Sequence, residues 1–256
     1  MLLLGAAAGC VRRIPDVAPS GPVDVAVITW NLHAGSGDVA RLIDDLTSIR
    51  LTAQPVRDYV LLLQEAVEQE ERGIRAIAST RRLSVAFAPV RRNRDRVTGN
   101  AILSTLPLGA TRAIDLPRER QPRGALIATI EVAGQPLAIV STHLENRLGW
   151  LRGLFGDRAR GRQATALLGQ IPSGHGVLGG DMNTMLGPDE PAWKAFLERF
   201  PDTPERPEPT FRDRLVLDHL FFDLPDGWIA TRQVVAGRYG SDHHPVLGLI
   251  MLRPEP

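Results

Sequence analysis

GVLGGDMN (176–183) is a short apolar run that ends in an aspartate and an asparagine. Its residues 177–180 predict a short strand. A strand that ends in a carboxylate holds that group rigidly at the rim of a sheet, where a substrate can reach it. Taken alone, Asp181 is equally well explained by a turn after two glycines. The segment therefore gains meaning only if other strands of the chain end in the same way.

Other predicted strands do end in polar residues. Asn31 follows VDVAVITW (23–30) and Glu65 follows YVLLLQ (59–64). The remaining polar residues at such ends are His143 after LAIVST, Asn183 two residues beyond Asp181, Asp218 and His219 within RLVLDHLFF, and Asp242, His243 and His244 before PVLGL. Each one has an ordinary structural explanation, such as a solvated strand end. Their recurrence instead predicts a functional rim.

The residue types at these strand ends share one chemistry. Carboxylate and amide oxygens are the ligands that Mg²⁺ prefers, and Mg²⁺ keeps waters and room for a substrate phosphate. Histidine is the natural base near neutral pH, and a neighbouring carboxylate fixes its tautomer. The set therefore predicts metal-assisted chemistry at a phosphate.

The rest of the chain mixes hairpins with alternating strands and helices. The pattern predicts helices over 38–50 (with Asp38 as N-cap), 68–79, 158–168 and 191–200. It predicts strands over 23–30, 59–63, 84–89, 100–104, 125–132, 137–142, 177–180, 215–222 and 246–252, and a loop over 201–209. This order is neither all-parallel nor all-β, and it predicts one α/β (α+β) domain that starts near Pro22.

Composition sets the class of protein. The chain has 256 residues, of which 43% are hydrophobic and 23% charged, and these values exclude a disordered chain, a collagen and a coiled coil. The net charge of +1 argues against a protein that coats nucleic acid by bulk charge. Lys194 is the only lysine, so 29 of the 30 basic residues are arginines. We interpret this chiefly as codon bias, and only weakly as selection for phosphate binding.

The strand-end segments carry a family resemblance. They are TWNLH (29–33), LLLQEA (61–66), GNAILS (99–104), STHLE (141–145), GGDMN (179–183), LDHLFF (217–222) and SDHHPV (241–246). In this order they resemble the endonuclease/exonuclease/phosphatase superfamily of DNase I-like phosphoesterases. The resemblance covers residues 29–246. It implies a four-layer sandwich, with two mostly antiparallel sheets face to face and helices outside.

The resemblance also implies a role for each site residue. The metal ligands would be Glu65, Asn31 and Asp242, for Mg²⁺ with Mn²⁺ as a substitute. His243, oriented by Asp218, would activate the attacking water. Asp181 and Asn183 would position that water and stabilise the developing charge, and His143 would donate to a phosphate oxygen. We prefer Asp218 and His243 over their neighbours His219 and His244, because adjacent residues on a strand face opposite sides.

Three functions remain open on the sequence. A nuclease is favoured by the basic segment of Arg81–Arg82 and 91–96, which is otherwise a solvated loop, but aromatic residues for base stacking are few. A phosphatase or phosphodiesterase for lipid or small phosphates is favoured by an arginine-rich, partly apolar segment over 147–162. A non-catalytic binding module would have lost site residues, and none is lost. We expect a phosphate-ester substrate such as DNA, no protein partner and a monomer.

The first residues suggest export. MLLLGAAAGC (1–10) resembles the end of a bacterial lipoprotein signal peptide, in which the cysteine becomes lipidated, although no basic residue precedes it. The alternative is a frayed terminus with an incidental cysteine. On the first interpretation, residues 1–22 are a signal segment and tether and residues 23–256 the catalytic domain. A bacterial cell envelope or secreted location is then favoured, with Cys10 as membrane anchor.

Overall fold

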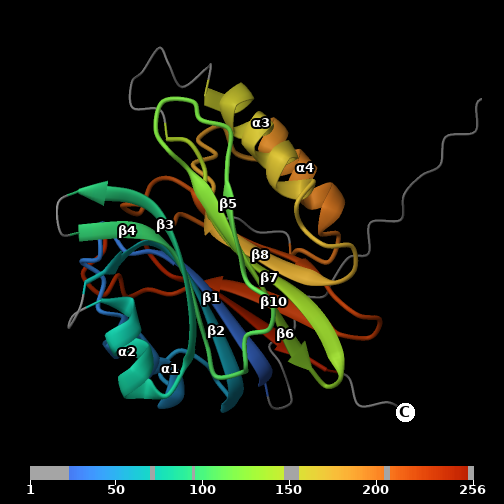
Figure 1. The fold of residues 1–256 in the computed structure, drawn as a ribbon. Helices are drawn as coiled ribbons and strands as arrows, with labels where there is room; N and C mark the ends of the chain where they lie inside the picture. The colour runs from blue at the N-terminus through green and yellow to red at the C-terminus, as the bar shows by residue number, and fades with distance from the viewer. Residues whose placement is uncertain (1–22, 70–72, 94–95, 147–155, 205–207, 253–256) are drawn as a thin grey trace, which may run out of the picture.

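Two β-sheets form the centre of the molecule (Figure 1). The computed structural model describes residues 23–69, 73–93, 96–146, 156–204 and 208–252. Cys10, the proposed tether and most of the apolar part of segment 147–162 lie outside them. The first sheet has the order β10-β11-β1-β2-β4-β3, formed by Ile229–Val234, Val246–Met251, Val23–Asn31, Val56–Glu68, Arg96–Ser104 and Ser84–Asn93. The second has the order β5-β6-β7-β8-β9, formed by Arg112–Asp115, Gly124–Val132, Gln135–His143, Gly176–Asp181 and Asp218–Asp223.

Each sheet contains one parallel pair among antiparallel neighbours. β1 runs parallel to β2, and β7 runs parallel to β8. Parallel strands end at the same edge of a sheet, so Asn31 lies opposite Gln64, and His143 lies opposite Asp181. β9 runs antiparallel to β8 and starts at Asp218, which lies opposite Asp181. The register of the sheets alone therefore gathers most of the predicted rim.

Helices cover the outer face of each sheet, as the four-layer prediction requires. α1 (Val39–Thr47) and α2 (Ile74–Arg81) lie on the first sheet. α3 (Gly156–Leu168) and α4 (Pro191–Arg199) lie on the second sheet, preceded by the short helix η2 (Gly187–Asp189). Within the described ranges, no helix is long and apolar enough to cross a bilayer. The fold is the predicted DNase I-like sandwich.

Three apolar layers hold the sandwich together. The layer between the sheets includes Val27, Leu62, Ile139, Val177 and Phe222, all with fully buried side chains. Burying such a side chain contributes about 1.5–3 kcal/mol, so this layer fixes how the sheets lie against each other. The outer layers pack α1 and α2 on one side and α3 and α4 on the other.

The first helix shows how the sequence pattern determines packing. The residues Val39, Leu42, Ile43 and Leu46 are buried on one face of α1, as their spacing predicts. Asp38 caps the helix, because its side chain accepts a hydrogen bond from the backbone N–H of Arg41 at 3.0 Å. Ile49 was expected on the same face, but α1 ends at Thr47 and Ile49 is 45% exposed.

Several predicted elements need correction. The helix predicted over 68–79 starts only at Ile74, because Glu68 still pairs with Val97 in β2. β9 starts at Asp218 rather than at residue 215. The segment 91–96 is not a plain loop, since Arg91 to Asn93 end β3 and Arg96 starts β4. β5 and β10, both edge strands, were not predicted.

Candidate active site

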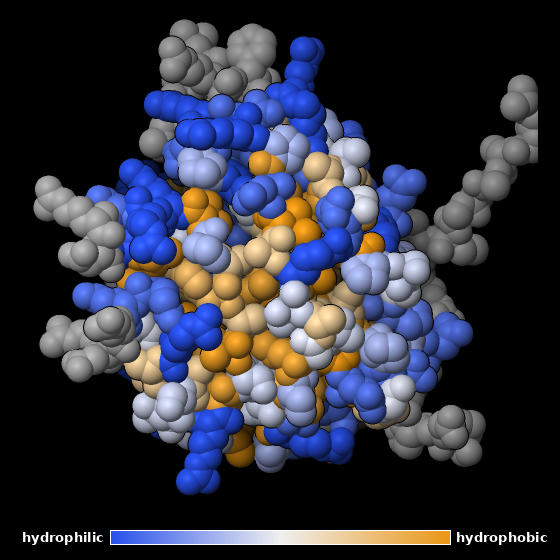
Figure 2. Space-filling model, viewed as in Figure 1, coloured by the Kyte–Doolittle hydropathy of each residue, from blue (hydrophilic) through white to orange (hydrophobic). Residues whose placement is uncertain are grey.

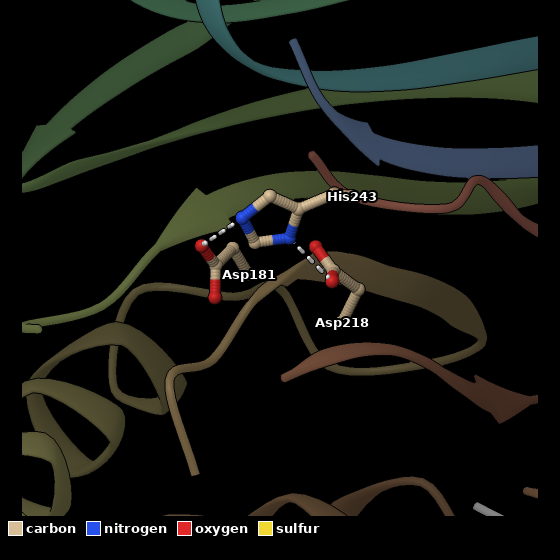
Figure 3. Close-up of side chains that lie close together, drawn as sticks. All are labelled: Asp181, Asp218 and His243. Carbon is tan, nitrogen blue, oxygen red and sulfur yellow. Dashed lines mark hydrogen bonds and ion pairs between the residues drawn. The ribbon is translucent and has the colours of Figure 1, made fainter. Parts of the chain in front are cut away.

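A histidine between two aspartates is the centre of the candidate site (Figure 3). Nδ1 of His243 donates a hydrogen bond of 2.8 Å to Oδ2 of Asp218. Its other ring nitrogen, Nε2, lies 3.9 Å from Oδ2 of Asp181. Asp218 and Asp181 come from the paired strands β9 and β8, and His243 comes from the loop that leads into β11. Elements far apart in the chain therefore converge on one imidazole.

The position of His243 is fixed from several sides. The ring of Phe211 packs against its imidazole at 4.7 Å between centroids. Its carbonyl accepts a hydrogen bond from the indole N–H of Trp30, and its N–H donates to the hydroxyl of Ser241. A side chain held in this way reaches its reacting geometry without further ordering.

The charges around His243 control its protonation. Burial lowers the pKa of this imidazole, but the charge of Asp218, its hydrogen bond, and the charges of Asp181 and Asp242 outweigh burial and raise the pKa to about 10. Without a bound cation His243 is therefore an imidazolium at neutral pH. The nearby carboxylates form the environment that a positive charge requires.

Asp181 sits at the meeting point of the two sheets. Its Oδ2 accepts a hydrogen bond of 2.9 Å from the amide of Asn31, and its Oδ1 accepts one from the N–H of Asn183. Burial, followed by the charge of Asp218, raises the pKa of the Asp181 carboxyl to about 7. A perturbed pKa with identified causes at a rim of this kind is typical of a functional site.

His143 links this cluster to Glu65. Its Nε2 lies 3.4 Å from Oδ2 of Asp181, and its Nδ1 lies 4.0 Å from Oε1 of Glu65. Burial first, and then the charges of Arg123 and His243, lower the pKa of His143 well below its usual value. His143 is therefore neutral, and one of its ring nitrogens carries a proton that it can donate.

Glu65 occupies a bulge in β2. The register with β4 shifts between Leu63 and Ala66, and Glu65 has a left-handed φ of 51°. A bulge re-aims the side chain that it carries, and a left-handed non-glycine residue at a functional rim indicates a constrained position. Oε2 of Glu65 accepts a hydrogen bond of 2.7 Å from the N–H of Ala34.

The donor set fits a divalent cation. Among the described residues, Oε1 of Glu65 accepts no hydrogen bond, and the buried Oδ1 of Asp218 and Nε2 of His143 have no hydrogen-bond partner. Asp181, Asp218 and His243 also offer ligand atoms within 4.8 Å of one another. Open carboxylate oxygens of this kind suit Mg²⁺ with its bound waters.

The other two predicted ligands already have partners. Oδ1 of Asn31 accepts a hydrogen bond from the N–H of His33. Asp242 pairs with Nδ1 of His33 at 2.7 Å and with Arg212 at 3.2 Å. Both residues lie at the predicted edge, but their roles as metal ligands remain predictions.

All eight predicted site residues are thus joined by a chain of contacts. The eighth, Asn183, has a left-handed φ of 51°, and its amide donates to the carbonyl of Leu144. The two rejected neighbours lie elsewhere. His219 faces the helices, where it packs on Trp193 at 4.2 Å, and His244 contacts the carbonyl of Val235 and Asp213.

The sequence interpretation missed Arg123. This residue is 8% exposed, yet Nε and Nη2 of its guanidinium have no hydrogen-bond partner in the described structure. Arg123 lines a cavity of about 770 Å³ that also reaches Glu65 and His143. The one weak signal visible in the sequence is a charged residue placed directly before an apolar strand.

Comparison with known proteins agrees with this geometry. The family model described as the Endonuclease/Exonuclease/phosphatase family matches residues 28–243. The chain belongs to this family. Endonuclease/Exonuclease/phosphatase proteins are metal-dependent hydrolases of phosphoesters, so this chain is a phosphoric ester hydrolase. No curated protein matches it in sequence.

Solved structures share the fold. The human Nocturnin catalytic domain has a TM-score of 0.64 and 19% identity, with 90% of this chain and 94% of that chain covered. A family protein from Leptotrichia buccalis has a TM-score of 0.65 and 15% identity, with 89% and 100% covered. Sphingomyelinase C from Streptomyces griseocarneus has a TM-score of 0.58 and 18% identity, with 90% and 99% covered. At these identities the likeness supports the fold alone.

Proposed function

We propose that this protein is a Mg²⁺-dependent phosphodiesterase with nuclease-like activity. The observation that carries the proposal is the imidazole of His243, held between Asp218 and Asp181 at the edge that also presents Glu65. A phosphodiester is protected by its negative charge, and hydrolysis needs a proton acceptor for water together with donors for the oxygens that gain charge.

The chain's own residues divide these tasks. Nε2 of His243 takes the proton of the attacking water, and Asp218 holds the ring in the required tautomer through Nδ1. Asp181 and Asn183 orient that water. His143, which is neutral, donates to a non-bridging oxygen of the phosphate. Water attacks directly, so no covalent enzyme intermediate forms.

A divalent cation would be held by Glu65, with Asn31 and Asp242 beside it. When bound, it would offset the charge of the phosphate and, by adding positive charge near Asp242 and Asp181, lower the pKa of His243 so that Nε2 accepts a proton.

Arginines around the cavity favour a nucleic acid over the lipid or small-phosphate alternative. Arg91, Arg96, Arg118, Arg120 and Arg123 line the cavity next to Glu65 and His143. Arginine binds phosphate oxygens through a planar fork and is common along nucleic-acid backbones. The apolar stretch that favours a lipid surface lies within residues 147–155, outside the described residues.

The test compares two classes of ester with and without metal. The full chain is incubated with Mg²⁺ or EDTA against supercoiled plasmid, and in parallel against phosphomonoesters and phospholipids. We expect plasmid nicking that requires Mg²⁺ and is lost in His243→Ala. His175→Ala changes a half-exposed histidine that contacts Asp223 instead, so it should keep full activity.

Two results would contradict the proposal. Nicking that persists in EDTA would remove the metal from the reaction. An inert plasmid together with Mg²⁺-dependent release from a phospholipid or small phosphate would replace the nuclease with the second function. Thermal unfolding of each variant shows whether a lost activity reflects a lost fold.

A further inference from the structure

The cavity beside the candidate site is lined almost entirely by one sign of charge. Among the described residues, its lining includes five arginines and one acidic residue, Glu65. Arg91 and Arg96 come from the β3–β4 hairpin, and Arg118, Arg120 and Arg123 come from the segment before β6. Figure 2 shows hydrophilic side chains gathered at the edge of the molecule where this hairpin ends.

These five arginines have no carboxylate partner in the described ranges. Elsewhere in the chain, arginines such as Arg50, Arg75 and Arg162 pair with Asp45, Glu68 and Glu119 at 2.6–2.7 Å. Close placement of like charges is unfavourable unless an anion offsets it. The cavity therefore presents positive charge that the described residues do not neutralise, and an anion could occupy it.

Arg123 is the strongest sign of such a ligand. Burial lowers its pKa, although the charges of Asp181, Glu145 and Glu65 act in the opposite direction. A buried guanidinium with unpaired N–H groups is destabilising, and bidentate pairing with a phosphate or carboxylate offsets this. Nε and Nη2 of the rigid Arg123 guanidinium can therefore donate together to the oxygens of one carboxylate or phosphate.

The backbone around Arg123 is held in place before any ligand arrives. The carbonyl of Arg123 accepts a hydrogen bond from Leu116, and the carbonyl of Gly124 accepts one of 2.7 Å from the amide of Asn100. Buried Glu145 accepts hydrogen bonds from the N–H groups of Arg120 and Gln121 at 2.9 and 3.1 Å. These contacts hold the arginine-bearing segment against both sheets, because Asn100 belongs to β4 of the first sheet.

The arginines of this cavity lie beside the position that the proposed function gives to the cleaved phosphate. In that proposal the phosphate under attack lies against His243 and Asp181, and neither residue lines the cavity. Only Glu65 and His143 belong to both places. The volume of about 770 Å³ also exceeds what one phosphate fills and matches pockets for a nucleotide-sized group.

We propose that the cavity binds a second phosphate of the substrate, next to the one that is cleaved, with Arg123 as its buried anchor. The substrate class is thus a compound with two phosphates a nucleotide apart. This rests on the proposed function and narrows it, because a zwitterionic lipid headgroup has no second anion to offer. Arg118 and Arg120 lie at the exposed rim of the cavity. They contribute positive charge to it rather than a buried binding surface.

The test measures binding of thymidine 3′,5′-bisphosphate and of the two thymidine monophosphates to the full chain in EDTA. We expect the bisphosphate to bind at least tenfold more tightly than either monophosphate. Arg123→Met should remove that preference, and Arg123→Lys should restore only part of it. Arg92→Met, on the same hairpin but outside the cavity, is the matched control and should retain the full preference.

Equal affinities in the unaltered chain would overturn the inference, as would a preference that survives in Arg123→Met. If Arg123→Met does not fold, the exposed double variant Arg118→Met with Arg120→Met replaces it and should weaken bisphosphate binding at least threefold. Hydrolysis of bis(4-nitrophenyl) phosphate with Mg²⁺, an ester with one phosphate, tests the proposed function separately. If the protein does not hydrolyse this ester, the proposed function is overturned. The binding comparison in EDTA does not depend on catalysis and can still be interpreted.

Discussion

At the scale of single residues, the Asp218–His243 pair decides the protonation of the site. Asp218 contributes both a charge and a hydrogen bond to the raised pKa of His243. In Asp218→Asn the charge is lost, so we expect the pKa of His243 to fall from about 10 by at least one unit. NMR titration of the imidazole signals in EDTA measures this shift. We also expect kcat to fall by about 10²–10⁴, because the ring loses its orienting partner.

A matched substitution tests whether the pKa of His243 falls because Asp218 is altered or because any nearby carboxylate charge is removed. Asp213 contacts Nε2 of His244, the neighbouring histidine, at 2.7 Å. Asp213→Asn should leave the titration of His243 in place. An unchanged pKa of His243 in Asp218→Asn would show that the pair does not control this imidazole.

Much of the site could be predicted from single residues, and part of it could not. Asp181, Glu65 and His143 each follow an apolar strand, and a strand end is visible in a sequence. Arg123 gave no comparable signal, because its burial and its lack of partners arise only when β6 packs beside the β3–β4 hairpin. Strand alternation alone predicted that His219 faces away from the site, and in the structure it packs on Trp193.

At the scale of elements, the parallel pair of β7 and β8 sets the spacing of the site. A Cβ atom at Gly180 would lie 2.0 Å from the carbonyl oxygen of Thr142 in β7. Gly180→Ala should therefore push the strands apart and destabilise the fold by about 1–3 kcal/mol. Because His143 lies opposite Asp181 one residue further on, activity should fall together with stability.

The measurement is urea unfolding together with plasmid nicking. Gly169→Ala is the matched control, since its nearest atoms lie at 3.7 Å, an ordinary contact distance. That variant should remain within about 0.5 kcal/mol of the unaltered protein. If Gly180→Ala has the same free energy of unfolding as the unaltered protein, β7 and β8 can accommodate a Cβ atom at this position, which contradicts the prediction.

The central strands could be predicted from the sequence, but two edge strands and one helix start could not. The central strands are continuous apolar runs or alternating β-branched stretches, so their existence could be predicted from the sequence pattern. β5 and β10 are edge strands with partly exposed residues, and pairing with a neighbour rather than their own pattern makes them strands. The helix expected over 68–79 started late because pairing with β4 extends β2 to Glu68.

At the scale of the whole molecule, the site should make stability depend on pH. The folded-state pKa values of Asp181 and His243 are raised, to about 7 and about 10, above usual values of 3.8 and 6.5. A group with a raised pKa stabilises the fold fully below its unfolded value and loses that contribution as pH rises through its folded value. Buried His143, whose pKa is lowered, acts in the opposite direction below about pH 6.5. In EDTA the free energy of unfolding should therefore decline between about pH 7 and pH 10.

Urea unfolding at several pH values measures whether the free energy of unfolding falls as the pH rises. Over pH 7 to 9.5 the slope due to one proton is at most about 1.4 kcal/mol per pH unit. The slope should be shallower in His243→Ala, which lacks the titrating ring. A slope that is the same in both proteins would assign the pH dependence to other groups.

The order of strands in the first sheet has a consequence for incomplete chains. Four of its strands come from residues 23–104, but β10 and β11 return from residues 229–251, after the whole second sheet. The loop between these two returning strands carries Asp242 and His243. A chain interrupted before that loop would contain Glu65 and Asp181 but not His243, the proposed base. On the proposed mechanism such a fragment is catalytically silent, and hydrolytic activity begins only when the polypeptide completes its first sheet.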